Sequence, residues 1–321
     1  MIVFTEFIPF TYYVLVLVVV MLIKYFIDHF FTFEPLRFFQ FYCEQLGNKV
    51  NNSRNSSQQQ TIAGLMALLI TLTPIGIILW LFSDFIAVDY IWHGLLLYFA
   101  LGGLHLGKIN NTVAQALLAK ENSTAKQALA PHLLRETNQL SLVGLSKAAI
   151  EMHLLRSMQQ IYVVAFIFLV IDPLAALSYR LILEMHYAWN TKLAKNKHFG
   201  FYSHFLSQLL LWLPSRMMAL LILMTSIGRG GLLYWRLTSM HFFKLNSDFI
   251  LGVHAFSLAV KLGGVAMYQQ DKIRKIAFND QGKQPEPSDI INAIYKVNFA
   301  IYSSLFLVVL LAAFLQFIMQ K

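Results

Sequence analysis

The chain has 321 residues, of which 57% are hydrophobic and only 13% are charged, and its mean hydropathy is +0.58. Soluble domains carry roughly 25% charged residues, so this composition excludes an ordinary soluble globule and predicts a protein in contact with the lipid bilayer. The net charge of +9 does not indicate nucleic-acid binding, because the Lys and Arg residues lie in loops between apolar runs and do not alternate with aromatic residues. The single cysteine, Cys43, excludes an internal disulfide bond and a cysteine-based metal cluster.

Six apolar runs follow one another along the chain. A membrane-spanning helix needs about 20 apolar residues. Residues 1–10 contain no Lys or Arg and no cleavage site of small residues, so we expect the first run to remain as a helix. The sequence therefore predicts an all-α fold, a polytopic α-helical membrane protein with four to six apolar segments and helical cytoplasmic loops. The six runs cover residues 10–26, 61–82, 88–107, 161–183, 208–228 and 300–319.

Polar segments divide these runs and predict the domain organisation. Residues 48–60 have no apolar periodicity and form a polar linker, whereas 108–160 are long enough for helices outside the bilayer. We expect N-terminal membrane helices over 1–107, a core with amphipathic helices over 108–297 and a C-terminal membrane helix over 298–321.

Charge predicts the orientation. If the basic loops lie on the cytoplasmic side of a bacterial inner membrane, the N-terminus is periplasmic. With six full spans, however, the basic loop around Lys195 would lie outside. The runs on either side of that loop contain Asp172-Pro173 and Pro214-Ser215-Arg216, and a proline removes a helix hydrogen bond. We infer that 161–183 and 208–228 are broken or re-entrant elements lining a polar cavity, and four true spans then place every basic loop inside.

Common catalytic motifs are missing from the chain. The stretch Gly102–Ile109 resembles a phosphate loop, but Ile109 stands where a magnesium-binding hydroxyl is required. No metal site is expected, because the histidines do not pair with carboxylates at ligand spacing, and His153 and His186 are interpreted as interfacial side chains. No cofactor is expected either.

Charged residues in the apolar runs are the better indicators of a site. Glu151 paired with Arg180 or Arg216 would satisfy the need of a buried charge for a partner, and Arg216 could bind a small anionic ligand. A salt bridge that only holds helices together is the alternative interpretation.

Several short stretches, taken together in their order and spacing, resemble the superfamily of the membrane-bound adenosylcobinamide-phosphate synthases CobD and CbiB, which includes the AmpE proteins. The stretch Ala148–Glu151 is similar to the start of the synthase pattern AAIES-x-x-EN-x-x-D, and Trp212–Arg216 is similar to W-I-P-A-R. The resemblance implies a ligand pocket formed by Glu151, Tyr179, Arg180, Arg216 and Asn246, with no catalytic residue assigned. The matching stretches are Leu134–Thr137, Ala148–Glu151, Tyr179–Arg180, His198–Gly200, Trp212–Arg216, Asn246–Ser247, Leu262–Gly264 and Asp289–Ile290.

Other positions depart from the synthase pattern, and they decided the functional prediction. Most of the acids that would hold Mg²⁺ and polyphosphate are missing. The resemblance therefore favours an AmpE-like regulatory or sensory membrane protein without synthase activity, and it implies the link of AmpE proteins to a cell-wall-recycling amidase partner and to β-lactamase induction. The departures fall at Leu155, Arg156, Gln159, Ser207, Gln208, Leu211 and Leu251.

Two other functions stay open on the sequence. The first alternative is a cobalamin-biosynthesis enzyme with a diverged site, which would join adenosylcobyric acid to an amino-alcohol phosphate with nucleotide consumption. The second is an unrelated transporter or structural protein, which the lack of an internal repeat disfavours. The oligomeric state is not indicated by the sequence.

Overall fold

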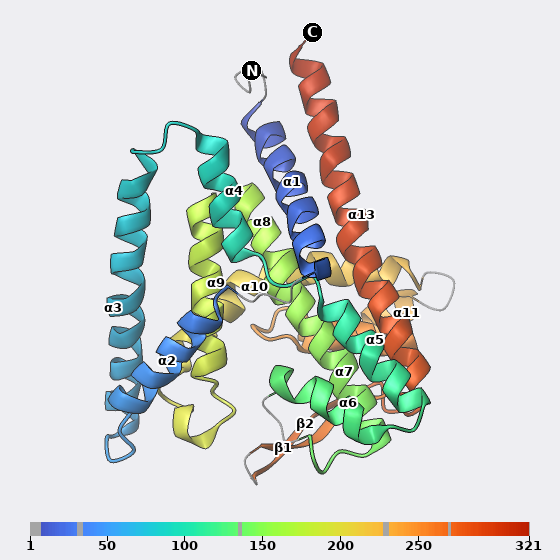
Figure 1. Cartoon of the computed structure of the whole chain (residues 1–321). Helices are drawn as coiled ribbons and strands as arrows, with labels where there is room; N and C mark the ends of the chain where they lie inside the picture. Colours follow the sequence, from blue (N-terminus) through green and yellow to red (C-terminus); the bar gives the residue numbers. More distant parts are fainter. Residues whose placement is uncertain (1–7, 31–34, 134–136, 227–230, 269–270, 321) are drawn as a thin grey trace. The chain divides into compact units, whose positions relative to one another are not determined.

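Long helices dominate the structure, a computed structural model that describes residues 8–30, 35–133, 137–226, 231–268 and 271–320 (Figure 1). The expected all-α class is confirmed, with one small hairpin added. The α-helices are α1 Pro9–Phe30, α2 Arg37–Val50, α3 Ser57–Ser83, α4 Asp89–Ala100, α5 Leu106–Leu118, α6 Asn122–Leu129, α7 Leu142–Ser157, α8 Val163–Val170, α9 Pro173–Ala188, α10 Phe201–Met224, α11 Gly231–Thr238, α12 Asp248–Leu258 and α13 Pro287–Met319. A π-helix, η3 Met158–Tyr162, joins α7 to α8, and the strands are β1 Leu262–Tyr268 and β2 Asp271–Phe278.

Five helical stretches within the described residues are long and apolar enough to cross a membrane. In the most apolar window of the last stretch only 11% of residues are buried inside the protein, so most of that surface is available to lipid. The chain is therefore a multi-pass membrane protein. The five stretches are Pro9–Phe30, Ser57–Ser83, Leu142–Val170, Phe201–Met224 and Pro287–Met319.

Two of the six predicted segments have a different form in the structure. The run 88–107 contains the short helix α4, whose 12 residues span about 18 Å and do not cross a core of about 30 Å. The run 161–183 is divided at Asp172, whose carboxylate accepts a hydrogen bond from Ala175 N at 2.7 Å and begins α9, with Pro173 in the first turn. Residues 208–224 of the run 208–228, in contrast, lie in α10, which continues through Pro214 to Met224; residues 227 and 228 are outside the described residues.

The chain forms two compact units, each built from separate stretches of sequence. The first comprises residues 1–104, 159–211 and 305–321, and the second comprises 105–158 and 212–304. The three-part domain division predicted from the sequence stays a prediction.

In the first unit, α9 is the central element and contacts α2, α3, α4 and α8. A small apolar core includes Trp189 and Phe199, whose rings meet edge to face with centroids 4.9 Å apart. The indole of Trp189 donates a 2.7 Å hydrogen bond to the Cys43 carbonyl, which fixes α2 beside the end of α9. This core places Tyr179 and Arg180 on a rigid helix.

Two charged side chains of α1 hold the chain where α4 ends. The buried Lys24 ammonium donates to the carbonyls of Tyr98 and Leu101, at 3.1 and 2.7 Å. One turn further on, the Asp28 carboxylate accepts from Leu104 N at 2.6 Å. These contacts satisfy backbone groups that the end of the helix leaves free, and they fix the segment that resembles a phosphate loop.

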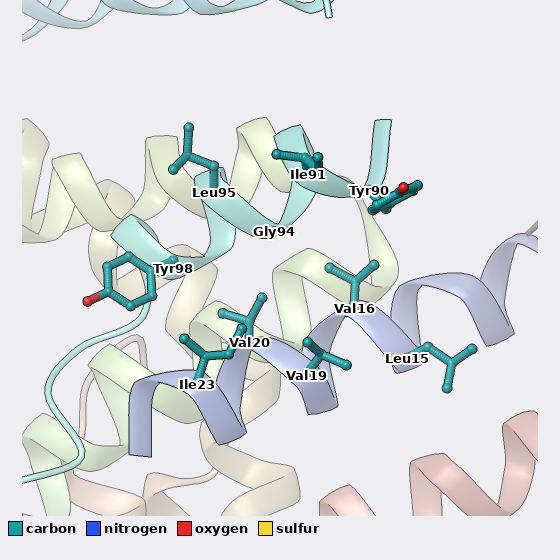
Figure 2. Close-up of a pocket in the computed structure, with 10 residues that line it drawn as sticks. All are labelled: Leu15, Val16, Val19, Val20, Ile23, Tyr90, Ile91, Gly94, Leu95 and Tyr98. Atoms are coloured by element: carbon teal, nitrogen blue, oxygen red, sulfur yellow. The ribbon is translucent and has the colours of Figure 1, made fainter. Parts of the chain in front are cut away.

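A groove of about 370 Å³ runs between α1 and α4 in the same unit (Figure 2). None of the residues that line it is charged, so the groove suits hydrocarbon and offers no ionic group for an anionic substrate. Its lining consists of Leu15, Val16, Val19, Val20, Ile23, Tyr90, Ile91, Gly94, Leu95 and Tyr98.

In the second unit, α5, α6, α7, α12, α13 and the hairpin share one apolar core. The antiparallel hairpin pairs Leu262 with Phe278 and has an irregular register between Gly263 and Val265. Gly263 has a φ of +71° and approaches the Ile276 carbonyl oxygen so closely that no Cβ would fit. The strands were not expected from the sequence, and they bring the Leu262–Gly264 stretch against α7.

Candidate functional site

Glu151 and Gly263 meet in the second unit although 112 residues separate them. A Glu151 carboxylate oxygen accepts a 2.8 Å hydrogen bond from Gly263 N, and only 9% of the glutamate surface is exposed. The pairing of β1 with β2 is irregular between Gly263 and Val265, and the left-handed φ of Gly263 favours glycine at this position. Two of the stretches that carry the family resemblance, Ala148–Glu151 and Leu262–Gly264, thus contact each other, and this contact fixes the orientation of a buried carboxylate.

Arg216 lies in a cage of backbone carbonyls. Its guanidinium donates to the carbonyls of Phe242 at 3.0 Å and Lys244 at 2.6 Å, and to the Ser215 hydroxyl at 2.7 Å. Longer bonds of 3.3 to 3.5 Å reach the carbonyls of Trp212, His241 and Asn246. The ring of Trp212 also lies 5.3 Å from the guanidinium carbon. Every nitrogen is engaged, which favours a positioning role over direct ligand binding.

Asn246 forms the turn that begins α12. Its amide donates to the Asp248 carboxylate at 2.7 Å, and its side-chain oxygen accepts from Asp248 N at 3.2 Å. This pattern is a local Asx turn at a helix start. Because Arg216 binds the carbonyl of Asn246, the Trp212–Arg216 and Asn246–Ser247 stretches form a second contact between segments of the resemblance.

Tyr179 and Arg180 lie on α9 in the first unit. The Tyr179 hydroxyl donates at 3.1 Å to the carbonyl of Gln159, within the π-helix η3. Arg180 forms a 2.6 Å ion pair with Glu184 one turn along α9, and both side chains are more than 90% buried. The sequence predicted Glu151 paired with Arg180 or Arg216, whereas the ion pair that the structure shows for Arg180 is with Glu184 on its own helix. The Nε and Nη1 atoms of Arg180 are buried without a hydrogen-bond partner, so the guanidinium retains donors for a ligand.

The five predicted residues are therefore divided between the two units. Glu151, Arg216 and Asn246 lie in the second unit, and Tyr179 and Arg180 lie in the first. A single pocket containing all five stays a prediction. Among the described residues no group of three His, Cys, Asp or Glu is arranged to hold a metal ion. The predicted stretch Leu134–Thr137 falls, apart from Thr137, outside the described residues.

Sequence analysis missed a polar cluster in the second unit. The Lys296 ammonium donates to the hydroxyls of Thr225 and Ser226 at 2.9 and 3.3 Å. Ser226 in turn bonds to the Ser257 hydroxyl at 2.7 Å. These residues lie on or beside three different helices, so no motif could have joined them, and a lysine within an apolar helix was the one available signal.

Two histidines also have surroundings that differ from the prediction. His153 and His186 were interpreted as interfacial, but they are only 2% and 8% exposed. His254 is fully buried as well, and burial, with the nearby His153 and Lys296, lowers its pKa to about 3. Both ring nitrogens of His153 and of His254 lack a hydrogen-bond partner.

The chain matches the CobD/Cbib protein family over residues 16–297, which include all five candidate residues. The chain belongs to the CobD/CbiB family.

Two relatives resemble the chain over most of its length. One, from Stutzerimonas stutzeri, is 28% identical over 205 residues, which cover 64% of this chain and 68% of the relative. The other, from Chromobacterium violaceum, is 27% identical over 237 residues, which cover 74% of this chain and 76% of the relative. Both are named Cobalamin biosynthesis protein CobD. No solved structure matches the chain.

These names overturn the function favoured from the sequence. An AmpE-like regulatory protein was expected because acids of the synthase pattern are missing. Both relatives are instead named for cobalamin biosynthesis. Their names support the first alternative, an enzyme of cobalamin biosynthesis. The departures from the synthase pattern therefore do not assign the chain to the AmpE-like branch.

Proposed function

We propose that this CobD/CbiB family member is a membrane enzyme of cobalamin biosynthesis, of the adenosylcobinamide-phosphate synthase type. The observation that carries the proposal is the family match over residues 16–297, together with two relatives named for this pathway. The reaction that the resemblance implies forms an amide between a carboxyl group of adenosylcobyric acid and the amine of an amino-alcohol phosphate, with nucleotide consumption.

Two clusters, one in each unit, provide chemistry that suits such substrates. In the first unit, Arg180 has two buried N–H-bearing nitrogens without partners, and an arginine is well matched to a carboxylate or a phosphate. In the second unit, the Glu151 carboxylate is buried and directed by Gly263 N. We assign Arg180 to binding an anionic group of a substrate. We assign Glu151 to positioning the substrate amine or to accepting a proton from it. Arg216 and Asn246 hold the segment before α12 in place.

Nucleotide-consuming chemistry implies Mg²⁺, and the donor set of this chain does not fit a metal held by the protein. Magnesium requires several oxygen ligands in octahedral geometry. The positions at which the resemblance places acids hold Leu155, Gln159 and Leu251 among others, and the described residues contain no cluster of metal-ligand side chains. The proposal therefore rests on the charged groups of the protein and includes no metal-dependent step.

Complementation tests the proposal directly. A bacterial strain that lacks its own synthase is supplied with this gene, and cobamides are measured by mass spectrometry while membrane insertion is followed by immunoblot. We expect cobamide production by the wild type and a strong loss with Glu151→Gln or Arg180→Lys. Exposed residues provide matched controls, Glu121→Gln and Arg236→Lys, which should retain production. A correctly inserted wild type that yields no cobamide would contradict the proposed function.

We further propose that the N-terminus is periplasmic and that the basic loops are cytoplasmic, which the excess of Lys and Arg supports. The loop between α9 and α10 is the most informative probe. The Lys195 ammonium in this loop donates a hydrogen bond to the side-chain oxygen of Asn48, so both residues lie on the same side of the membrane. A Lys195→Cys variant should be labelled by a membrane-impermeant thiol reagent only after cells are opened. Labelling in intact cells would contradict this orientation.

A further inference from the structure

The cluster of Lys296, Thr225, Ser226 and Ser257, here termed the hydroxyl–lysine cluster, has no part in the proposed reaction. It lies within the second unit and joins α13, the end of α10 and α12. Its hydroxyls form a continuous set, because Lys296 bonds to Thr225 and Ser226, and Ser226 bonds to Ser257. Ser226 and Ser257 are only 2% and 4% exposed, whereas Lys296 is partly exposed. A ligand therefore has a way in beside the lysine.

Two imidazoles extend this cluster into the core of the unit. His254 lies one turn before Ser257 on α12, and the charge of Lys296 and the ring of His153 both act on it electrostatically. All four ring nitrogens of His153 and His254 are buried without a hydrogen-bond partner. Leaving a buried polar group unsatisfied costs about 1–3 kcal/mol, so four such atoms within one unit require an explanation.

The chemistry of these groups selects an anion. An ammonium, three hydroxyls and two imidazoles can all donate hydrogen bonds, and they come from several helices and hence from several directions. A tetrahedral oxyanion needs donors distributed in this way, whereas a flat carboxylate is better matched by one arginine fork. A cation is disfavoured because the lysine would repel it.

We propose that the hydroxyl–lysine cluster, with His153 and His254 beside it, is a binding site for a phosphate group. The ligand is a phosphate monoester or inorganic phosphate, or else the phosphate of a lipid headgroup, since the chemistry of recognition is the same. The Thr225 and Ser226 hydroxyls accept from Lys296 in the structure. On phosphate binding the hydroxyls rotate to donate to the ligand, and Thr225 exchanges its 2.6 Å bond to the Ile222 carbonyl for one to the phosphate. This inference goes beyond the proposed function, because it assigns a site that takes no part in the amide-forming step described above.

Binding of inorganic phosphate and of glycerol phosphate to the purified full-length protein in detergent tests the site. Isothermal titration measures the affinity, with chloride at matched ionic strength as the blank. Loss of a charge-assisted hydrogen bond costs roughly tenfold or more in affinity, so we expect at least this loss in Lys296→Met and in Ser226→Ala. Lys261, a partly exposed lysine of the same unit that pairs with Asp280 at 2.6 Å, provides the matched control Lys261→Met. Ser304 on α13 provides the hydroxyl control Ser304→Ala, because it bonds only to the nearby Ile301 carbonyl among the described contacts.

The outcomes separate the sources of phosphate and keep the test decisive. Binding of either soluble probe that depends on Lys296 supports a soluble ligand. Binding seen only with phosphatidylglycerol nanodiscs, and lost in Lys296→Met, supports a lipid headgroup. If Lys296→Met fails to fold, Ser226→Ala decides. Wild-type protein that binds none of the three probes, or variants that bind as tightly as the wild type, would overturn the site. Complementation is measured separately, so failure of this site and failure of the proposed function are distinguishable.

Discussion

Replacing Arg216 by lysine keeps the charge and removes the planar fork. The guanidinium makes three short hydrogen bonds, to the Lys244 carbonyl at 2.6 Å, the Ser215 hydroxyl at 2.7 Å and the Phe242 carbonyl at 3.0 Å, and three longer ones. A lysine has three donors at one point, and we expect it to reach one or two of these acceptors. Two buried carbonyls left unsatisfied, at about 1–2 kcal/mol each, predict a loss of about 2–4 kcal/mol of folding stability.

The assay is unfolding of the purified protein in mild detergent, with Arg236→Lys as the matched control. Arg236 is exposed on α11, so its substitution should change stability by less than about 0.5 kcal/mol. Because Arg216 is assigned a positioning role, Arg216→Lys should lower the folded fraction and the activity together, with KM for the anionic substrate unchanged. An unchanged stability combined with a raised KM would refute this role and favour ligand binding by Arg216.

Three more predictions follow from single contacts. Gly263→Ala should destabilise the protein by more than about 1 kcal/mol and reduce complementation. The reason is that φ is +71° and a Cβ would clash with the Ile276 carbonyl. Gly264→Ala, where only φ is unfavourable, should destabilise the protein less in the same unfolding assay. Burial raises the pKa of Cys43 to about 12, so the folded protein should react with a thiol reagent at pH 8 far more slowly than the unfolded chain, and equal rates would refute this. Because the pKa of His254 is lowered to about 3, the unfolded chain binds a proton below pH 6.5 that the folded protein does not. The free energy of unfolding should therefore decrease as the pH is lowered, by up to about 2 kcal/mol at pH 5. His254→Gln should reduce this dependence of stability on pH.

The ends and breaks of helices could be predicted from the sequence only where a capping residue or a proline lies at the break. Asp172-Pro173 indicated a break, and there the carboxylate of Asp172 caps α9. The end of α4 at Ala100 had no comparable signal, because Leu101 to Leu106 are mostly apolar or glycine, and the structure instead uses Lys24 and Asp28 from α1 to satisfy this segment. Pro214 suggested a break in a helix that continues. Apolar composition therefore predicted how much of the chain is helical better than where each helix ends.

The contacts of the site could not be derived from spacing. Glu151 and Gly263 are 112 residues apart, and the hairpin that joins them does not show a regular alternation of apolar and polar residues in the sequence. The resemblance identified both stretches without indicating that they touch. Lys296 lies at the end of the predicted core over 108–297, and its hydroxyl partners are far from it in the sequence. Sequence patterns record local periodicity, whereas these contacts depend on tertiary packing.

Gln159 explains why the missing acids misled the functional prediction. It stands where the synthase pattern has an aspartate, which suggested a lost site. Yet Tyr179 binds the backbone carbonyl of Gln159, a group that any residue provides, and the Gln159 side chain accepts from Tyr187 at 2.8 Å. The same holds for Arg216, whose partners are mainly carbonyls. These contacts use main-chain groups, which every residue provides, so a departure from the pattern limits which metal ligands the protein can offer and does not by itself assign the chain to another pathway.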